Sequence, residues 1–413
     1  MENHLHSCGS EPLVIKSESR GQRSTPSSKA GTTEGKDVMG QLHISLDPAR
    51  VGRDATSLQR ALRAIIIGQD EAINHIVDVY QTYVTGMSAP GRPIANFLFL
   101  GPTGSGKTRT VEALAEALVN NPSAVVKIDC AEYQHGHEIA KLIGSPPGYL
   151  GHRETHALLS QETLDEYHSN TVKVSFVLFD EIEKASDVLW NLLLGILDKG
   201  ILTLGDNRRV DFSRSMIFMT SNLGAAEMAA LMTPKLGFKT LQECTVPGYP
   251  DEKLDRKLSN TGEQAARRKF TPEFMNRIDK VVVFKPLGAR ELRRVLDIEL
   301  ANVQRRVLNS SMGTSFVFTM TNSGKAFLLS EGTDLRYGAR HLKRAIDRLL
   351  VRPLSHLIAS EQVSSGDWVQ VDFDENVQKL VFTKEAEDLG ISAMARVVQT
   401  KVGLLPVLLQ ATA

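Results

Sequence analysis

The chain has little of what would indicate a disulfide framework, a zinc site or a membrane span. Its three cysteines, Cys8, Cys130 and Cys244, are odd in number and far apart, which fits neither disulfide pairing nor clustered zinc ligands. No apolar run approaches the roughly 18 residues of a transmembrane helix, and residues 1–10 lack the hydrophobic stretch of a signal peptide. These absences predict a protein that acts without a membrane in a reducing compartment, the cytoplasm.

The chain also lacks a net charge, because 48 Lys and Arg side chains balance 48 Asp and Glu side chains. A neutral chain has no global field that would recruit nucleic acid, which argues against an enzyme that moves along DNA. Its 413 residues, 42% of them apolar, are enough for about two to three domains with ample cores.

Composition and periodicity divide the chain into four parts. Residues 7–40 are rich in Ser, Gly, Thr, Lys and Glu, so residues 1–45 are predicted to form a disordered tail. Residues 46–285 alternate strands with helical patterns, which indicates an α/β domain whose parallel sheet is covered by helices on both faces. Residues 286–374, which begin with Pro286, predict a small, mostly helical domain, and residues 375–413 are left as a C-terminal extension.

Individual elements follow from the same patterns. The five predicted strands of the sheet lie at 96–100, 124–129, 174–179, 215–220 and 281–284. A hairpin is predicted where 201–204 and 209–212 flank Gly205-Asp206-Asn207. Helices are predicted at 111–118, 185–199, 289–308, 323–331 and 338–361, with a further strand at 368–371.

The most informative motif is Gly101-Pro102-Thr103-Gly104-Ser105-Gly106-Lys107-Thr108, which stands between a predicted strand and a predicted helix. In that context the backbone N–H groups of a glycine turn surround phosphate oxygens, and the helix directs its positive end at them. Lys107 is expected to reach the β- and γ-phosphates of ATP, and the Thr108 hydroxyl to ligate Mg²⁺.

A second chemical element follows the apolar strand at 174–179. Asp180 is placed to hold Mg²⁺ through its water shell, and Glu181 is the candidate base for an attacking water molecule. The alternative is that the two acids only cap a strand. Phosphoryl transfer depends mainly on positioning and charge neutralisation, so this small set of groups is chemically sufficient.

With these motifs in place, residues 60–372 resemble the Clp branch of the AAA+ ATPases, the protein unfoldases and disaggregases, and are most similar to the second ATPase module of two-module members. The resemblance implies that Ile67 and Gly68, within Ile66-Ile67-Gly68-Gln69, pack on adenine. It also implies that Asn222, in Thr220-Ser221-Asn222, is sensor 1 and orients the water and γ-phosphate.

Two arginines take roles only through this resemblance. Arg277, in a segment running from Phe270 to Asp279, matches the arginine finger that acts on a neighbouring subunit's ATP, and Arg340, in Gly338-Ala339-Arg340, matches sensor 2. An arginine supplied in trans accelerates P-loop enzymes by about 10³ to 10⁵. The resemblance therefore implies a homo-hexameric ring.

The segment Gly148-Tyr149-Leu150-Gly151 indicates the substrate. Two glycines around an aromatic and an aliphatic residue form a mobile loop that displays a large side chain, or else a simple turn with a packed Tyr. In the Clp family the matching loop lines a central pore and grips unfolded or tagged polypeptides. After Gly151 the chain carries His152-Arg153-Glu154-Thr155-His156 where the family usually has an acidic, Gly-rich run, so substrate preference stays open.

Two further features have modest interpretations. The histidines at 135, 137, 152 and 156 do not form the His-Glu-x-x-His pattern of a zinc site and are taken as surface residues. Leu236-Gly237-Phe238 resembles the tripeptide by which some family members dock on a separate peptidase, although such tripeptides recur freely. Besides the expected ATP-driven protein unfoldase, a nucleic-acid-remodelling AAA+ enzyme and a non-hydrolysing scaffold remain as alternatives. The first alternative would require a basic pore or a DNA-binding appendage, and the second would require the loss of Glu181 or Arg277.

Overall fold

The structure is a computed structural model that describes residues 46–48, 50–145, 157–169, 172–232, 252–309, 314–333 and 338–397. The chain divides into two compact units, Met1–Arg50 and Val51–Ala413, and the elements described below belong to the second. The predicted tail at 1–45 lies outside the described residues. Of the helices that are described, none is long and apolar enough to cross a membrane.

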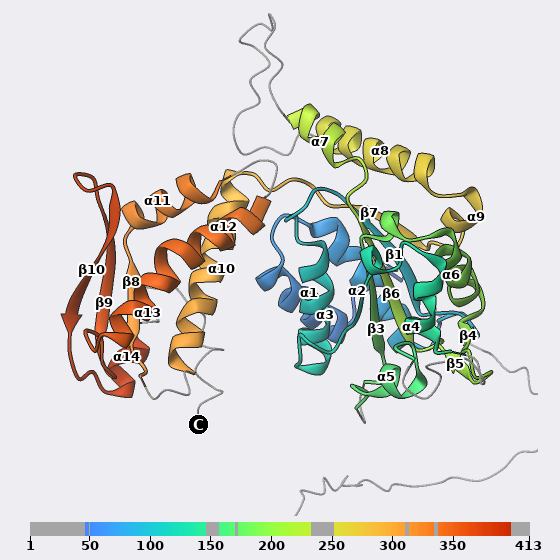
Figure 1. The fold of residues 1–413 in the computed structure, drawn as a ribbon, viewed down its shortest axis with the longest axis horizontal. Coiled ribbons are helices and arrows are strands. Elements are labelled where there is room, and N and C mark those ends of the chain that lie inside the picture. The colour runs from blue at the N-terminus through green and yellow to red at the C-terminus, as the bar shows by residue number, and fades with distance from the viewer. Residues whose placement is uncertain are drawn as a thin grey trace, which may run out of the picture. The chain divides into compact units, whose positions relative to one another are not determined.

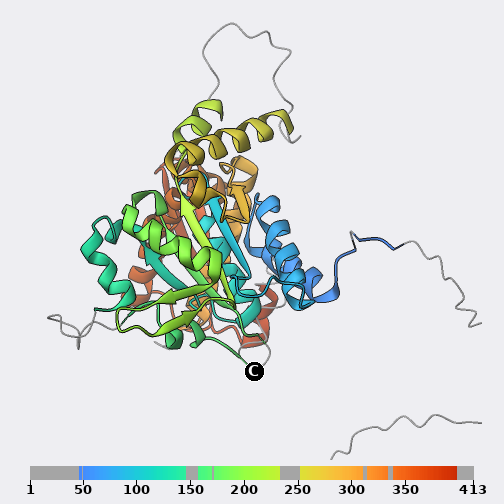
Figure 2. The ribbon, with the colours of Figure 1, turned by 90° about the vertical axis from the view of Figure 1, so that its right-hand side faces the viewer.

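The centre of the N-terminal part is a parallel five-stranded sheet, as the sequence predicts. Its strands are β1 (Ala95–Leu100), β2 (Val126–Asp129), β3 (Ser175–Asp180), β6 (Ser215–Ser221) and β7 (Lys280–Val283). They lie in the order β2-β3-β6-β1-β7, and all neighbouring pairs run parallel. β1 and β6 are buried along their whole length, as expected for strands with helices on both faces. In Figure 2 they lie side by side as cyan and yellow-green arrows.

Successive residues of each strand enter two different cores, because side chains alternate across a sheet. Phe97, Phe99 and Phe218 pack together on one face, where the rings of Phe97 and Phe218 are stacked with centroids 5.2 Å apart. Leu98 and Leu100 enter the core on the other face. Figure 1 shows α1 and α3 on one side of the sheet and α6 on the other.

The helices of this part are α1 (Arg53–Ile65), α2 (Asp70–Val84), α3 (Lys107–Val119), α4 (Ala140–Ile143), α5 (Gln161–Asp165), α6 (Asp187–Lys199), α7 (Ala225–Met232), α8 (Glu252–Lys269) and α9 (Pro272–Met275), with short 3₁₀ turns η1 (Cys130–Glu132), η2 (Gly136–Ile139) and η3 (Ile182–Lys184). The predicted hairpin is present as β4 (Ile201–Thr203) and β5 (Arg209–Asp211), which pair antiparallel. Asn207 supplies the positive φ, +67°, that its turn requires.

The C-terminal part contains more sheet than the sequence predicts. Its elements are α10 (Ala289–Leu308), β8 (Val317–Met320), α11 (Asn322–Gly332), α12 (Gly338–Ile346), a π-helical turn η5 (Asp347–Val351), α13 (Arg352–Ala359), β9 (Trp368–Asp374), β10 (Lys379–Ala386) and α14 (Ile391–Val397). The predicted strand at 368–371 is the start of β9, but β8 and β10 flank it in a sheet of order β10-β9-β8 that was not expected. Because β10 begins at Lys379 and pairs antiparallel with β9, this sheet continues past the predicted boundary at residue 374.

The predicted helix at 338–361 is interrupted by the π-helical turn η5, which stands between α12 and α13. Pro353 at the start of α13 explains the interruption. Proline has no N–H and its ring clashes with the carbonyl group four residues earlier, so the preceding turn widens.

Candidate active site

The glycine loop between β1 and α3 lies at the carboxyl edge of the sheet. Gly101 has a φ of +144°, and a Cβ at this position would lie 2.4 Å from the carbonyl oxygen of Phe284, so only glycine fits. Gly104 and Gly106 also have positive φ values of +76° and +103°. The space beside Gly106 is open, with no atom within 4 Å of a Cβ built there. The loop therefore combines the backbone and the space that a phosphate group requires, in front of the positive end of α3.

Lys107, the first residue of α3, is a buried ammonium group whose hydrogen-bond acceptors are neutral. The residue is 8% exposed. Its Nζ donates to the carbonyl oxygens of Gly101 at 2.7 Å and Pro102 at 3.0 Å, and to Oδ1 of Asn222 at 3.0 Å. Burial lowers the pKa of Lys107 to about 8, against the attraction of Asp180. A buried cation with neutral partners is poised to gain an anionic one.

Two carboxylates stand at the end of strand β3, which is separated from β1 by β6. Asp180 ends the strand, and Glu181 follows in the left-handed conformation with a φ of +57°. The Thr220 hydroxyl donates to Asp180 and accepts from the backbone N–H of Glu181 at 3.1 Å. The Glu181 carboxylate accepts from Nδ2 of Asn222 at 3.3 Å and pairs with Lys184. Non-glycine residues seldom adopt this backbone conformation, and here it coincides with side-chain bonds that hold the carboxylate at the sheet edge.

Asn222, which follows β6, connects the glycine loop with the carboxylates. Besides its bonds to Lys107 and Glu181, its backbone N–H donates to Oε1 of Glu183 at 3.0 Å. The other carboxylate oxygen of Glu183 is buried and has no hydrogen-bond partner among the described residues. Glu183 is not among the residues that the sequence predicts, because its bond to Asn222 spans 39 positions and has no local signature.

Most of the predicted site residues line one cleft of about 280 Å³. The predicted residues along its wall are Ile67, Thr103, Gly104, Ser105, Gly106, Lys107, Thr108, Asp180, Glu181, Asn222 and Arg340. The apolar side chains of Ile66, Ile67, Leu287 and Val295 also line this cleft. An apolar wall beside a phosphate loop suits the base of a nucleotide.

Three predicted residues lie next to this cleft without lining it. The carbonyl groups of Gly101 and Pro102 accept hydrogen bonds from Nζ of Lys107. Gly68, with a φ of +76°, packs against the side chain of Glu291, where a Cβ would lie 3.1 Å from Cγ. The segment predicted to contact adenine is thus in direct contact with α10.

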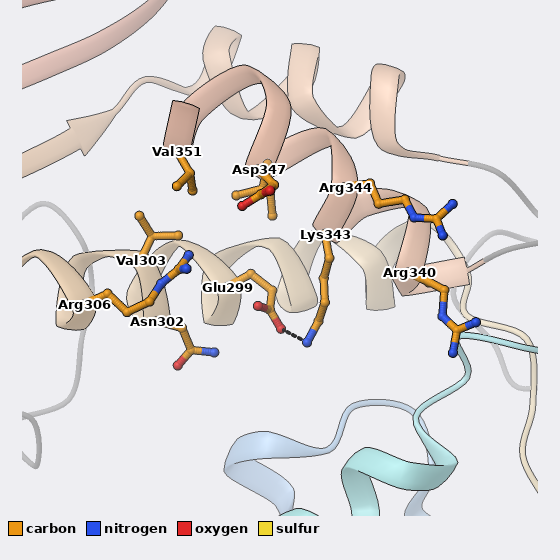
Figure 3. Close-up of a pocket in the computed structure, with 10 residues that line it drawn as sticks. Glu299, Asn302, Val303, Arg306, Arg340, Lys343, Arg344, Asp347 and Val351 are labelled. Atoms are coloured by element: carbon orange, nitrogen blue, oxygen red, sulfur yellow. Dashed lines mark ion pairs between the residues drawn. The ribbon is translucent and has the colours of Figure 1, made fainter. Parts of the chain in front are cut away.

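The start of α12 contacts the phosphate loop. The backbone N–H of Ala339 donates to the carbonyl oxygen of Gly104 at 3.2 Å. Arg340 is exposed and lines both the cleft and an adjoining pocket of about 430 Å³. In that pocket Lys343 of α12 reaches across to Glu299 of α10, at 2.8 Å (Figure 3). The structure therefore brings Arg340 to the cleft.

Arg277 does not line the cleft. Its Nη1 donates to the carbonyl oxygen of Glu273 at 3.0 Å, and its Nη2 lies 3.3 Å from the Glu273 carboxylate and 3.9 Å from that of Asp198. Its side chain is 25% exposed. Any role of Arg277 in catalysis therefore requires the cleft of another copy of the chain.

Several predictions concern segments outside the described residues. These are the pore segment Gly148-Tyr149-Leu150-Gly151, the histidines His152 and His156, and Leu236-Gly237-Phe238. Of the described histidines, His135 and His137 stack with ring centroids 5.7 Å apart, and the backbone N–H of His135 donates to Glu138. Across the described parts of the chain, no group of three or more His, Cys, Asp and Glu residues could hold a metal ion.

A glycine loop that ends in a buried lysine, an asparagine after the adjacent strand β6 and carboxylates at the end of the next strand, β3, together define a P-loop nucleotide-binding domain. Residues 92–281 match the family described as "AAA domain (Cdc48 subfamily)", and residues 287–371 match "C-terminal, D2-small domain, of ClpB protein". The chain thus belongs to the Clp-type AAA+ ATPases and resembles the second module of their two-module members.

Individual relatives agree with this assignment. The chaperone protein ClpB of Bdellovibrio bacteriovorus is 38% identical over 314 residues, which cover 76% of this chain and 33% of the relative. The chloroplastic ClpB2 of Oryza sativa subsp. japonica is 35% identical over 344 residues, covering 81% and 33%. Among solved structures, the S. cerevisiae Hsp104:casein complex superimposes with a TM-score of 0.66 at 28% identity, covering 80% of this chain and 53% of that one. The chain therefore spans about a third of the length of the curated relatives it matches.

Proposed function

We propose that the chain binds ATP with Mg²⁺ in the cleft and hydrolyses it. The observation that carries this proposal is the buried Lys107 ammonium, bonded only to neutral oxygens at the base of the glycine loop. The hydroxyl of Ser105, also in the loop, is buried and has no hydrogen-bond partner in the part of the chain that the structure describes. Both groups gain a partner when phosphate oxygens enter.

The cleft also suits a magnesium ion. Thr108 and Asp180 both line it, and hydroxyl and carboxylate oxygens are ligands that Mg²⁺ prefers. When bound, the ion would neutralise charge on the β- and γ-phosphates.

The remaining side chains take complementary roles in hydrolysis. Glu181 accepts a proton from the attacking water, for which its carboxylate must exchange the bond with Lys184 for one with that water. Asn222, fixed by Glu183, orients Glu181 and the γ-phosphate. Arg340 adds positive charge from α12, and Ile67, which lines the cleft, packs on the adenine while Gly68 supports it from the next position.

The test is a pair of substitutions that separate binding from turnover. Glu181→Gln keeps the shape of the side chain but removes the base, so ATP should bind with nearly unchanged affinity while turnover falls by about 10² to 10⁴. Lys107→Ala should instead weaken binding itself. Glu227→Gln, an exposed glutamate on α7, is the matched control and should hydrolyse ATP like the wild type. Wild-type turnover in Glu181→Gln would exclude Glu181 as the base.

We further propose that the active form is a homo-hexameric ring in which Arg277 completes the cleft of the neighbouring subunit. Two observations support this. Arg277 lies away from the cleft of its own chain, and the chain belongs to a family of ring-forming ATPases.

The substrate we propose is unfolded or tagged polypeptide, gripped by Tyr149 in a central pore, and the setting is the cytoplasm. Support comes from similar proteins, which include ClpB chaperones and Hsp104 in a complex with casein. ATP turnover should rise when unfolded casein is added and should not respond to DNA. A rise in turnover with DNA would instead favour a nucleic-acid-remodelling enzyme. Docking on a separate peptidase through Leu236-Gly237-Phe238 stays a prediction.

A further inference from the structure

Gln69 is a buried glutamine that joins two distant segments of the chain. It is 4% exposed and precedes α2. Its Nε2 donates to the carbonyl oxygen of Ser105 at 3.2 Å and to that of Lys285 at 2.9 Å. Its Oε1 accepts from the backbone N–H of Lys285 at 3.1 Å. The side-chain amide thus uses both of its N–H groups and its oxygen on backbone atoms.

The two segments have different tasks. Ser105 belongs to the phosphate loop, whereas Lys285 lies between β7 and α10, where the chain leaves the sheet for the C-terminal part. The side chain of Lys285 also pairs with Asp255 of α8 at 2.6 Å. Next to Gln69, Gly68 packs against Glu291 at the start of α10. The backbone of the joining segment is therefore tied to the phosphate loop through the side chain of Gln69.

These bonds constrain relative motion of the loop and the joining segment. Buried backbone N–H and C=O groups require partners. If the loop moved away from Lys285, Gln69 could follow only one of the two segments, and groups on the other would lose their bonds.

We propose that Gln69 is a positioning residue that couples nucleotide occupancy of the phosphate loop to the order of the segment joining the two domains. The proposal rests on the proposed nucleotide-binding function. A ligand that fixes the Ser105 carbonyl fixes Gln69, and Gln69 in turn fixes both backbone groups of Lys285. The start of α10 is then more ordered when nucleotide fills the cleft than when the cleft is empty.

Amide hydrogen exchange of the full chain, with and without ADP and Mg²⁺, tests this coupling. Openings that abolish binding are suppressed about a hundredfold when the ligand is present at about 100 times its Kd. In the wild type, the amides of residues 103–107 and the amide of Lys285 should slow by similar factors. In Gln69→Met the loop amides should still slow, and Lys285 should keep its nucleotide-free rate.

A matched control is Gln59→Met on α1, since the Gln59 side chain donates to the exposed Asn74 and lies outside the cleft lining. This variant should behave like the wild type. Gln69→Glu is a second variant in case Gln69→Met does not fold: it keeps an acceptor for the Lys285 N–H but loses both Nε2 donors, and the response of Lys285 should shrink.

The wild-type measurement alone can overturn the proposal. Slowed loop amides with an unchanged Lys285 rate would refute the coupling and leave nucleotide binding intact. An equal response of Lys285 in wild type and Gln69→Met would show that another route carries the effect and would also refute the role of Gln69. Loop amides that ignore ADP would instead refute the proposed nucleotide binding, and the coupling with it.

Discussion

The affinity for nucleotide should fall as the pH rises above 8, because Lys107 loses its proton in that range. Burial lowers the pKa of Lys107 in the nucleotide-free protein from 10.5 to about 8. Phosphate oxygens beside Nζ favour the ammonium form and raise this pKa again. Nucleotide binding near and above pH 8 is then accompanied by proton uptake, and linkage requires the affinity to decrease with pH there.

The size of the effect follows from the pKa. With a pKa of about 8, half of the Lys107 side chains are protonated at pH 8 and about a tenth at pH 9. The affinity for ATP should therefore fall about tenfold from pH 7 to pH 9 and stay nearly constant below pH 7.5, apart from titration of ATP itself. Calorimetry in buffers of different ionisation enthalpy should detect uptake of about half a proton per ATP at pH 8.

Lys107→Arg is the control, because a guanidinium group stays charged throughout this range. It should bind more weakly but with little dependence on pH. A wild-type affinity that is constant from pH 7 to 9.5, with no proton uptake, would refute the reasoning.

The stability of the nucleotide-free protein should show the opposite trend. Because the folded pKa of Lys107 lies below its ordinary value, the unfolded chain binds more protons between about pH 8 and 10.5. The contribution of Lys107 to the free energy of unfolding therefore rises with pH across that window. It is measured as the difference between the wild type and Lys107→Met.

Three further predictions concern assembly, substrate grip and the active-site network. Arg277→Ala should keep its nucleotide affinity and lose hydrolysis, and in mixed rings it should lower the ATPase rate by more than the fraction of mutant subunits. A loss of rate strictly proportional to that fraction would contradict a role in trans. Tyr149→Ala should hydrolyse ATP but fail to unfold a tagged fluorescent protein, and full unfolding activity would refute the pore assignment. Thr220→Val removes the hydroxyl between Asp180 and the Glu181 backbone, so turnover should fall by about tenfold or more at similar ATP affinity, whereas unchanged turnover would make that hydroxyl dispensable.

Local sequence was sufficient for the features whose causes are local. The five strands are short apolar runs, and the phosphate loop is a strand, a glycine turn and a helix in immediate succession. Asp180 and Glu181 could be predicted for the same reason, since they directly follow an apolar strand. The roles of Arg277 and Arg340, by contrast, came from resemblance to a family, and only Arg340 has been brought to the cleft by the fold of its own chain.

Features that depend on distant partners were beyond the sequence. β8 and β10 are stabilised by pairing with β9, because an isolated strand has no partners for its backbone groups. The interruption at η5 could have been foreseen from Pro353, but the widened turn is one of several ways in which a helix accommodates proline.

The order of elements in the α/β part and the phosphate loop were thus determined by the sequence itself, through periodicity and turn chemistry that operate over a few residues. Tertiary structure alone decided which segments meet. The strand order places β1 between β6 and β7, and so brings Asn222 to Lys107 across 115 positions. Gln69 reaches Lys285 across 216 positions. Such contacts form only when the whole sheet and its helices bury their apolar faces together, and no local pattern records them.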